Sequence, residues 1–68
     1  MPVEYKKLWL MLVERNISKP QLRKMAKLSS ASLTKLNKNE YVSMGVLTKI
    51  CATLKCNIGD IVDVVVES

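Results

Sequence analysis

The side chains most able to bind another molecule are the basic ones in the middle of the chain. Residues 15–39 contain seven lysines and arginines and no acid. Residues 1–14 balance two bases with two acids, and residues 40–68 carry two bases and four acids. A basic segment between neutral and acidic ends is typical of proteins that bind polyanions such as nucleic acids, although a solvated lysine-rich face is the alternative. The seven cations are Arg15, Lys19, Arg23, Lys24, Lys27, Lys35 and Lys38.

Small polar side chains gather in the C-terminal half of this basic segment. They are Ser29, Ser30, Ser32, Thr34, Lys35 and Lys38. Hydroxyl and ammonium groups reach base edges and phosphates when they project from a helix that lies in the major groove of DNA. The positions from Ser30 to Thr34 contain no Arg, Asn or Gln, the residues whose paired hydrogen bonds to a base each contribute about 1–3 kcal/mol of discrimination. We therefore expect modest sequence specificity, with phosphate contacts supplying much of the affinity.

Catalysis and metal binding have few residues to draw on. The sequence has no histidine and six carboxylates, which leaves little for acid–base catalysis or a catalytic triad. Cys51 and Cys56 are five residues apart, a rotation of roughly 500° on a helix, so we do not expect them to share a face. Two thiolates also fall short of the four ligands of a structural zinc site. We expect no enzyme activity, no metal and no cofactor, and two free, mostly buried thiols rather than a disulfide or metal pair.

The length and hydropathy of the chain limit its architecture. Sixty-eight residues form one domain with a small core, so association with a second copy is a reasonable expectation. The longest apolar run, Leu8–Val13, has six residues and is too short to span a bilayer, and no signal peptide is readable. The sequence predicts a soluble, cytoplasmic protein with no membrane partner.

Apolar spacing and capping residues predict the elements that position the polar side chains. A first helix, to about residue 15, is indicated by apolar residues at i, i+3, i+4 and i+7: Tyr5, Leu8, Trp9 and Leu12. Asn16 follows it and can adopt the left-handed conformation that ends a helix. A second helix covers residues 19–26, because Ser18 is a good N-cap and Pro20 lies in the first turn, where its missing N–H is tolerated.

Two further helices follow the second. A short break at residues 27–29 leads to a third helix, capped by Ser29 or Ser30 and ending near Asn37. Ser43 caps a fourth helix, whose apolar residues again have helical spacing: Leu47, Ile50, Cys51 and Leu54. Two short helices with a short break between them, the second polar on its outside, form the unit that inserts a helix into DNA.

The C-terminal residues predict no single conformation. A short final turn or helix is expected at residues 60–62, but residues 62–66 contain four valines, which are strand-like and disfavour a helix. The two alternatives are a frayed tail packed loosely on the core and a strand that pairs with the same strand of a second copy. Three apolar residues lie off the inward face of the first helix: Leu10, Met11 and Val13. Together with the valines they motivate the hypothesis of a homodimer.

Several segments together carry a family resemblance. The stretch Ile17–Leu36, the turn Lys38-Asn39 and the run Lys49-Ile50-Cys51-Ala52-Thr53-Leu54 resemble the Cro/C1-type (Xre) helix-turn-helix family. The ending Cys56–Val62 is similar to small single-domain members of that family, and the likeness extends over about residues 5–63. It implies an all-α, five-helix, lambda-repressor-like domain over residues 1–68 with a short extended C-terminal tail. It places the helix-turn-helix at about residues 19–37 and implies binding to operator DNA, usually as a dimer on a palindromic site.

The resemblance also implies which residues contact DNA. The base-reading positions on the third helix correspond to Ser30, Ala31, Thr34 and Lys35. The position that often bridges to a phosphate at the start of the second helix is Lys19, in place of the commoner Gln. Backbone-contacting positions correspond to Lys38, Asn39 and Ser43, and the N–H groups after Ser29 suit a phosphate. Two departures are Arg23, where the family has a small Ala, and Lys27, where it has Gly in the turn; a positive φ at a non-Gly residue costs about 1 kcal/mol.

These observations favour a sequence-specific transcriptional regulator that inserts residues 29–37 in the major groove of double-stranded DNA as a homodimer. The alternative is a protein-interaction module with the same fold, such as an antitoxin-like or anti-regulator partner, which would use the apolar faces of the first helix and the tail. RNA binding is disfavoured because the basic segment has no aromatic residues to stack on bases. No small-molecule ligand is expected.

Overall fold

Serine side chains set the beginnings of three helices. The hydroxyl oxygens of Ser18, Ser29 and Ser43 each accept a hydrogen bond from the backbone N–H three residues further on, at 3.1–3.2 Å. Gln21 also accepts from the Ser18 N–H at 2.8 Å, which completes a capping box. Each cap satisfies a donor that the helix itself leaves free and stabilises the helix by about 1 kcal/mol.

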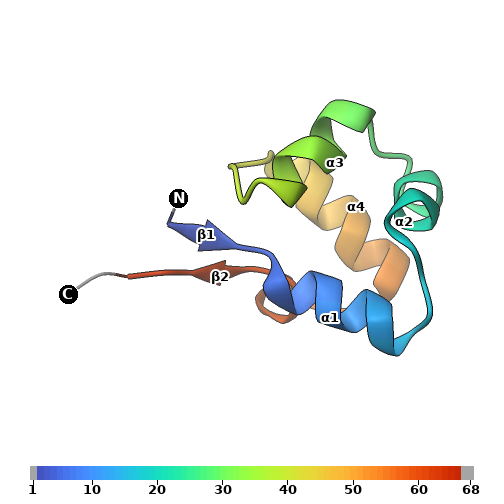
Figure 1. Cartoon of the computed structure of the whole chain (residues 1–68), viewed down its shortest axis with the longest axis horizontal. Helices are drawn as coiled ribbons and strands as arrows, with labels where there is room; N and C mark the ends of the chain where they lie inside the picture. The colour runs from blue at the N-terminus through green and yellow to red at the C-terminus, as the bar shows by residue number, and fades with distance from the viewer. Residues whose placement is uncertain (1, 67–68) are drawn as a thin grey trace.

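These signals produce four α-helices, one 3-10 helix and a two-stranded sheet in the computed structural model, which describes residues 2–66 (Figure 1). In chain order the elements are β1 (Val3–Glu4), α1 (Lys6–Glu14), α2 (Lys19–Met25), α3 (Ser30–Asn37), α4 (Met44–Leu54), η1 (Ile58–Asp60) and β2 (Asp63–Val64). The four predicted helices are therefore confirmed, with ends within two residues of the predicted ones. None of the helices in this described part is long and apolar enough to cross a membrane.

All four α-helices end in the same way, which we call the left-handed closure. The residue that closes each helix has a φ of 54–56°, and none of the four is a glycine: Asn16, Lys27, Asn39 and Lys55. The N–H of the next residue then donates to the carbonyl five positions back, at 2.9–3.1 Å: Ile17 to Leu12, Leu28 to Arg23, Glu40 to Lys35, and Cys56 to Cys51. This Schellman-type bond satisfies a carbonyl at the helix end and turns the chain sharply. The positive φ implied for Lys27 is thus confirmed.

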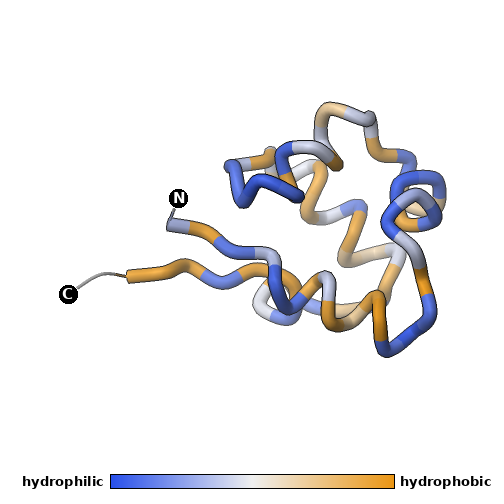
Figure 2. Tube along the Cα trace, in the orientation of Figure 1, coloured by the Kyte–Doolittle hydropathy of each residue, from blue (hydrophilic) through white to orange (hydrophobic). Residues whose placement is uncertain are grey.

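The core is built from one fully buried side chain of each helix and one that follows η1. These five residues have no exposed surface: Leu8, Leu22, Leu36, Ile50 and Ile61. Burying a side chain of this size stabilises the fold by about 1.5–3 kcal/mol. Figure 2 shows hydrophobic residues along α1, α4 and β2, whereas hydrophilic residues dominate α2 and the turn after α3. The core therefore fixes α2 and α3 through single leucines and leaves most of their surface polar.

The prediction of a fifth α-helix is wrong. Its place is taken by η1, a single 3-10 turn in which the Asp60 N–H donates to the Asn57 carbonyl at 2.9 Å. The Asp60 carboxylate accepts from the Asn57 N–H at 3.0 Å, so this short turn is closed on itself. A longer helix cannot follow, because the β-branched valines of residues 62–66 favour an extended chain.

The C-terminal tail is extended, as the resemblance implied, but the alternative of a frayed tail is wrong within the described residues, and pairing with a second copy stays a prediction. The tail forms β2, which pairs antiparallel with β1 of the same chain, Val3 opposite Val64 and Glu4 opposite Asp63. The Val65 N–H extends the pairing to the Pro2 carbonyl at 2.6 Å. Figure 1 shows the two strands side by side at one end of the molecule. The domain is thus mostly helical, with a small sheet that the sequence did not reveal because the pairing joins residues about sixty positions apart.

Hydrogen bonds of Tyr5 join the start of α1 to the turn after α3. The Tyr5 side chain is 2% exposed, and its hydroxyl donates to the Glu40 carbonyl at 2.6 Å. Burial raises the pKa of the phenol, so the hydroxyl remains a proton donor throughout the neutral range. The backbone N–H of Tyr5 donates to Asn39 Oδ1 at 3.3 Å, which adds a second bond to the same turn.

We expect Tyr5→Phe to lower the free energy of unfolding by about 1–2 kcal/mol, because the Glu40 carbonyl loses its buried donor. Urea titration followed by circular dichroism measures the change. The matched control is Tyr41→Phe, since Tyr41 is 58% exposed and its variant should stay within about 0.5 kcal/mol of wild type. Equal effects of the two substitutions would contradict the role of Tyr5.

Candidate nucleic-acid interface

The helix-turn-helix unit is held from inside by leucines. Leu22 of α2 and Leu36 of α3 have no exposed surface, and Leu28 in the connecting turn is 5% exposed. The left-handed closure at Lys27 turns the chain between the two helices, with the Leu28 N–H on the Arg23 carbonyl. The Arg23 side chain is half-buried at this point, where the family pattern has a small residue. The unit is therefore fixed by packing and leaves the opposite side of α3 free.

The outer face of α3 carries the four predicted base-reading residues. Ser30, Ala31, Thr34 and Lys35 are all exposed, and their spacing places them on one side of the helix. The Thr34 hydroxyl donates to the Ser30 carbonyl at 2.9 Å, so its oxygen remains available as an acceptor. This face is narrow, polar and carries one positive charge, that of Lys35.

Three of the other predicted contact residues are engaged in holding the fold. The Ser29 hydroxyl accepts from the Ser32 N–H and donates to the Ser32 hydroxyl at 3.0 Å. Ser43 is occupied as the N-cap of α4. Asn39 is half-buried, has a positive φ, and accepts from the Tyr5 N–H through Oδ1. Their first role is to position α3, and a nucleic-acid contact would fall to their remaining polar atoms. Lys38, in contrast, is exposed at the C-terminal end of α3.

Lys19 is held in place by two residues that the sequence did not indicate. Its ammonium lies 4.1 Å from the centre of the Trp9 ring and 2.6 Å from Asn37 Oδ1. A cation over an indole face is attracted by the ring's electron density, and the amide oxygen fixes its direction. Trp9 is half-buried against the core, as predicted, and the face of its ring contacts the Lys19 ammonium. The contact links α1, α2 and the end of α3, three elements that no sequence periodicity connects.

The charge of the basic segment is almost entirely unneutralised. Within residues 2–66 the one ion pair joins Lys7 and Asp63 at 2.9 Å, and neither belongs to residues 15–39. Like Lys19, Arg15 makes a structural contact: its Nη1 donates to the Leu54 carbonyl at 2.6 Å, which satisfies the end of α4. The seven cations of the segment have no acidic partner in the described structure, which keeps the field around α2 and α3 positive.

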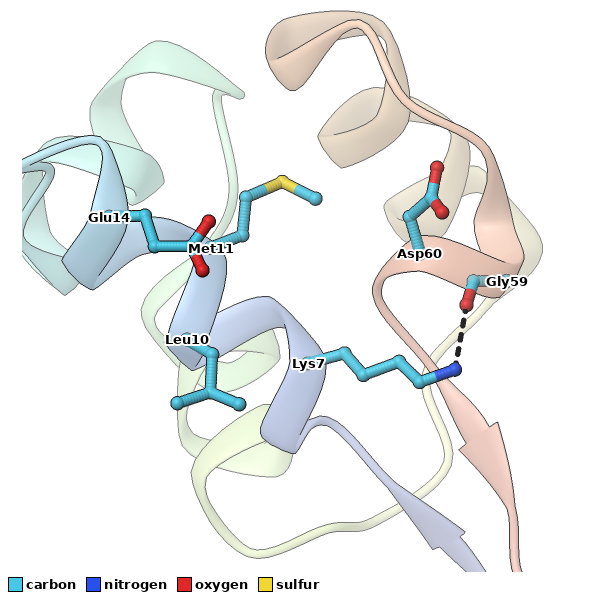
Figure 3. A pocket seen from close by; sticks show the side chains of 6 residues that line it. All are labelled: Lys7, Leu10, Met11, Glu14, Gly59 and Asp60. Carbon is cyan, nitrogen blue, oxygen red and sulfur yellow. Dashed lines mark hydrogen bonds between the residues drawn. The ribbon is translucent and has the colours of Figure 1, made fainter.

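A second surface, apolar rather than basic, lies on α1. Leu10 is 52% exposed and Val13 74%, so both point away from the core as predicted. Next to them is an open hollow between α1 and η1, which is lined by Lys7, Leu10, Met11, Glu14, Gly59 and Asp60 (Figure 3). Figure 3 shows Lys7 reaching across the hollow, where its ammonium donates to the Gly59 carbonyl at 3.2 Å.

Comparison with known proteins places this arrangement in a family. The pattern of the Cro/C1-type HTH DNA-binding domain matches residues 7–67. The crystal structure of the transcriptional regulator VanUg (form II) is similar at a TM-score of 0.93 and 42% sequence identity, covering 97% of this chain and 88% of that chain. No curated protein sequence matches. The chain belongs to the family of Cro/C1-type helix-turn-helix DNA-binding domains.

Proposed function

We propose that the chain is a transcriptional regulator that inserts α3 into the major groove of an operator and binds it as a homodimer. The observation that carries the proposal is the exposed face of α3, which contains no acids and is surrounded by cations that have no acidic partner among residues 2–66. The membership in a DNA-binding family and the likeness to a transcriptional regulator support it.

The roles of the residues follow from their chemistry. Lys35 can donate to the acceptors of a guanine, Ser30 and Thr34 can bond to either base type, and the Ala31 methyl can contact the methyl of a thymine. The Lys19 ammonium and Lys38 both lie at the C-terminal end of α3, where we expect them to contact phosphates, as backbone-positioning residues do. Because the base contacts are few, phosphate contacts supply most of the affinity.

Dimerisation would compensate for the weak base readout of one copy. Two copies related by a two-fold axis read two half-sites about one helical turn apart, so the contacts of one domain are made twice. The apolar surface of Leu10 and Val13 is the candidate interface, because exposed apolar side chains next to one another favour burial against a partner. The same surface supports the second candidate function, a protein-interaction module, which differs by lacking affinity for duplex DNA.

Lys35→Ala should reduce the preference for a selected operator over a random duplex by about 1–3 kcal/mol, because the discriminating base contact is lost. The operator comes from selection on random duplex DNA, and fluorescence anisotropy gives both dissociation constants. Lys55→Ala is the matched control, since Lys55 lies at the far end of α4. A preference that Lys35→Ala leaves intact would contradict the placement of α3, and absence of binding to any duplex would favour the interaction module.

Lys19→Met should make the salt dependence of binding shallower. If one domain neutralises about four phosphates, log K falls with log salt at a slope of about −3.6, and the variant loses about 0.9 of that slope. Trp9 is the one tryptophan of the chain, so its fluorescence should change when DNA draws the ammonium away, and this change should vanish in Lys19→Met. Lys55→Met should keep both signals. A flat salt response in wild type would refute phosphate-driven binding.

Leu10→Glu should separate a dimer into monomers, because it places a charge in the proposed apolar interface. Sedimentation equilibrium at micromolar concentration, without DNA, measures the mass. Met44→Glu is the matched control, since Met44 is 61% exposed on the first turn of α4 and outside that surface. A wild-type mass of one chain, or an equal loss of mass in both variants, would count against this interface.

A further inference from the structure

The two cysteines occupy the two ends of the left-handed closure of α4. Cys51 supplies the carbonyl and Cys56 the N–H of its hydrogen bond, at 3.1 Å, and Lys55 between them has a φ of 54°. The expectation that the thiols lie on different faces is wrong, because it assumed one continuous helix. The helix ends at Leu54, and the left-handed residue turns Cys56 back toward Cys51.

This closure brings the side chains at its two ends together. In other helices of this kind the contact is hydrophobic, and here the closure of α1 follows that pattern with Leu12 and Ile17. In α4 both positions hold a thiol. The two cysteines are free, half-buried and packed on the same core. They also line one open hollow, together with Ala52, Lys55, Asn57 and Asp60.

We propose that Cys51 and Cys56 form a dithiol site that a small-molecule disulfide converts to an intramolecular disulfide. The thiolate of one cysteine attacks a sulfur of the reagent, forms a mixed disulfide and releases one equivalent of thiol. The second cysteine loses its proton and attacks the protein sulfur of that mixed disulfide, which releases the second thiol. The protein loses two hydrogens and two electrons, and the reagent is reduced to two thiols.

The fold places the second thiol close to the mixed disulfide that it must attack. A disulfide requires its two backbones to be close, and here they are already joined by a hydrogen bond. The mixed disulfide therefore has its resolving thiol beside it and needs no unfolding to react. The hollow is open to solvent, which gives a small reagent access to the two half-buried thiols.

The charges around Cys56 set the pH range of the reaction. Burial and the neighbouring Cys51 raise the pKa of the Cys56 thiol, as does Asp60 of η1, whereas Arg15 at the end of α1 acts in the opposite direction. The thiolate is the attacking species, so the rate rises with pH. A mildly alkaline buffer is therefore the suitable condition for a test.

The test incubates the reduced full chain with oxidised glutathione and follows it by intact-protein mass spectrometry. The expected product is a monomer lighter by two hydrogen atoms, with no glutathione retained and no thiol left for alkylation. Its Tm should exceed that of the reduced chain by several degrees, because the cross-link restricts the unfolded state. The reductant dithiothreitol should restore the original mass and Tm.

The matched controls are Cys51→Ser and Cys56→Ser, each checked for native circular dichroism. Each variant should stop at one retained glutathione, because it lacks the resolving thiol. A wild-type product with two glutathiones, a covalent dimer, or no reaction under conditions that modify either single variant would overturn the proposal. If a serine variant does not fold, the mass of the wild-type product alone tests the proposal. Only an intramolecular disulfide lowers the mass of the monomer by two hydrogen atoms.

Discussion

The left-handed closure at the end of every α-helix is the constraint on which the rest of this structure depends. Four short helices must reverse direction within a few residues, and each does so with a positive φ followed by a hydrogen bond to the carbonyl five positions back. Asparagine tolerates this conformation, but at Lys27 and Lys55 it costs about 1 kcal/mol each. This conformational cost is offset because the sharp turns let one buried side chain from each helix meet in a single core.

The same packing explains why the surface of α2 and α3 is polar and basic. Leu22 and Leu36 anchor α2 and α3 internally, so nearly everything else on these helices is free to be polar. The outer face of α3 carries few functional groups, whereas the cations around it are numerous and have no acidic partner within the described residues. A domain of this kind is suited to holding the phosphate backbone firmly and reading few bases.

The ends of α3 and α4 also determine which side chains lie together on the surface. The closure of α3 ends in a turn that hydrogen bonds of Tyr5 with Asn39 and Glu40 join to the start of α1, which fixes the position of α3. The closure of α4 brings two thiols together beside η1. The hollow beside the apolar residues of α1 reaches the other side of η1, and Asp60 lines both hollows. The same backbone conformation thus shapes the turn beside α3 and brings the two thiols together after α4.

The sequence by itself determined the four helices, the serine caps of three of them and the exposed positions on α3, because all of these follow from local propensity and helical spacing. The left-handed turn at Lys27 was indicated only by the resemblance to a family that has Gly there. The sequence did not determine the small sheet, the contact of Lys19 with Trp9, or the pairing of Cys51 with Cys56. The first two join segments that are distant in the chain, and only packing brings such segments together. The third depends on where α4 ends, since one left-handed residue reverses the direction in which Cys56 points. Tertiary structure therefore decided which side chains meet, whereas local sequence had already decided which helices would carry them.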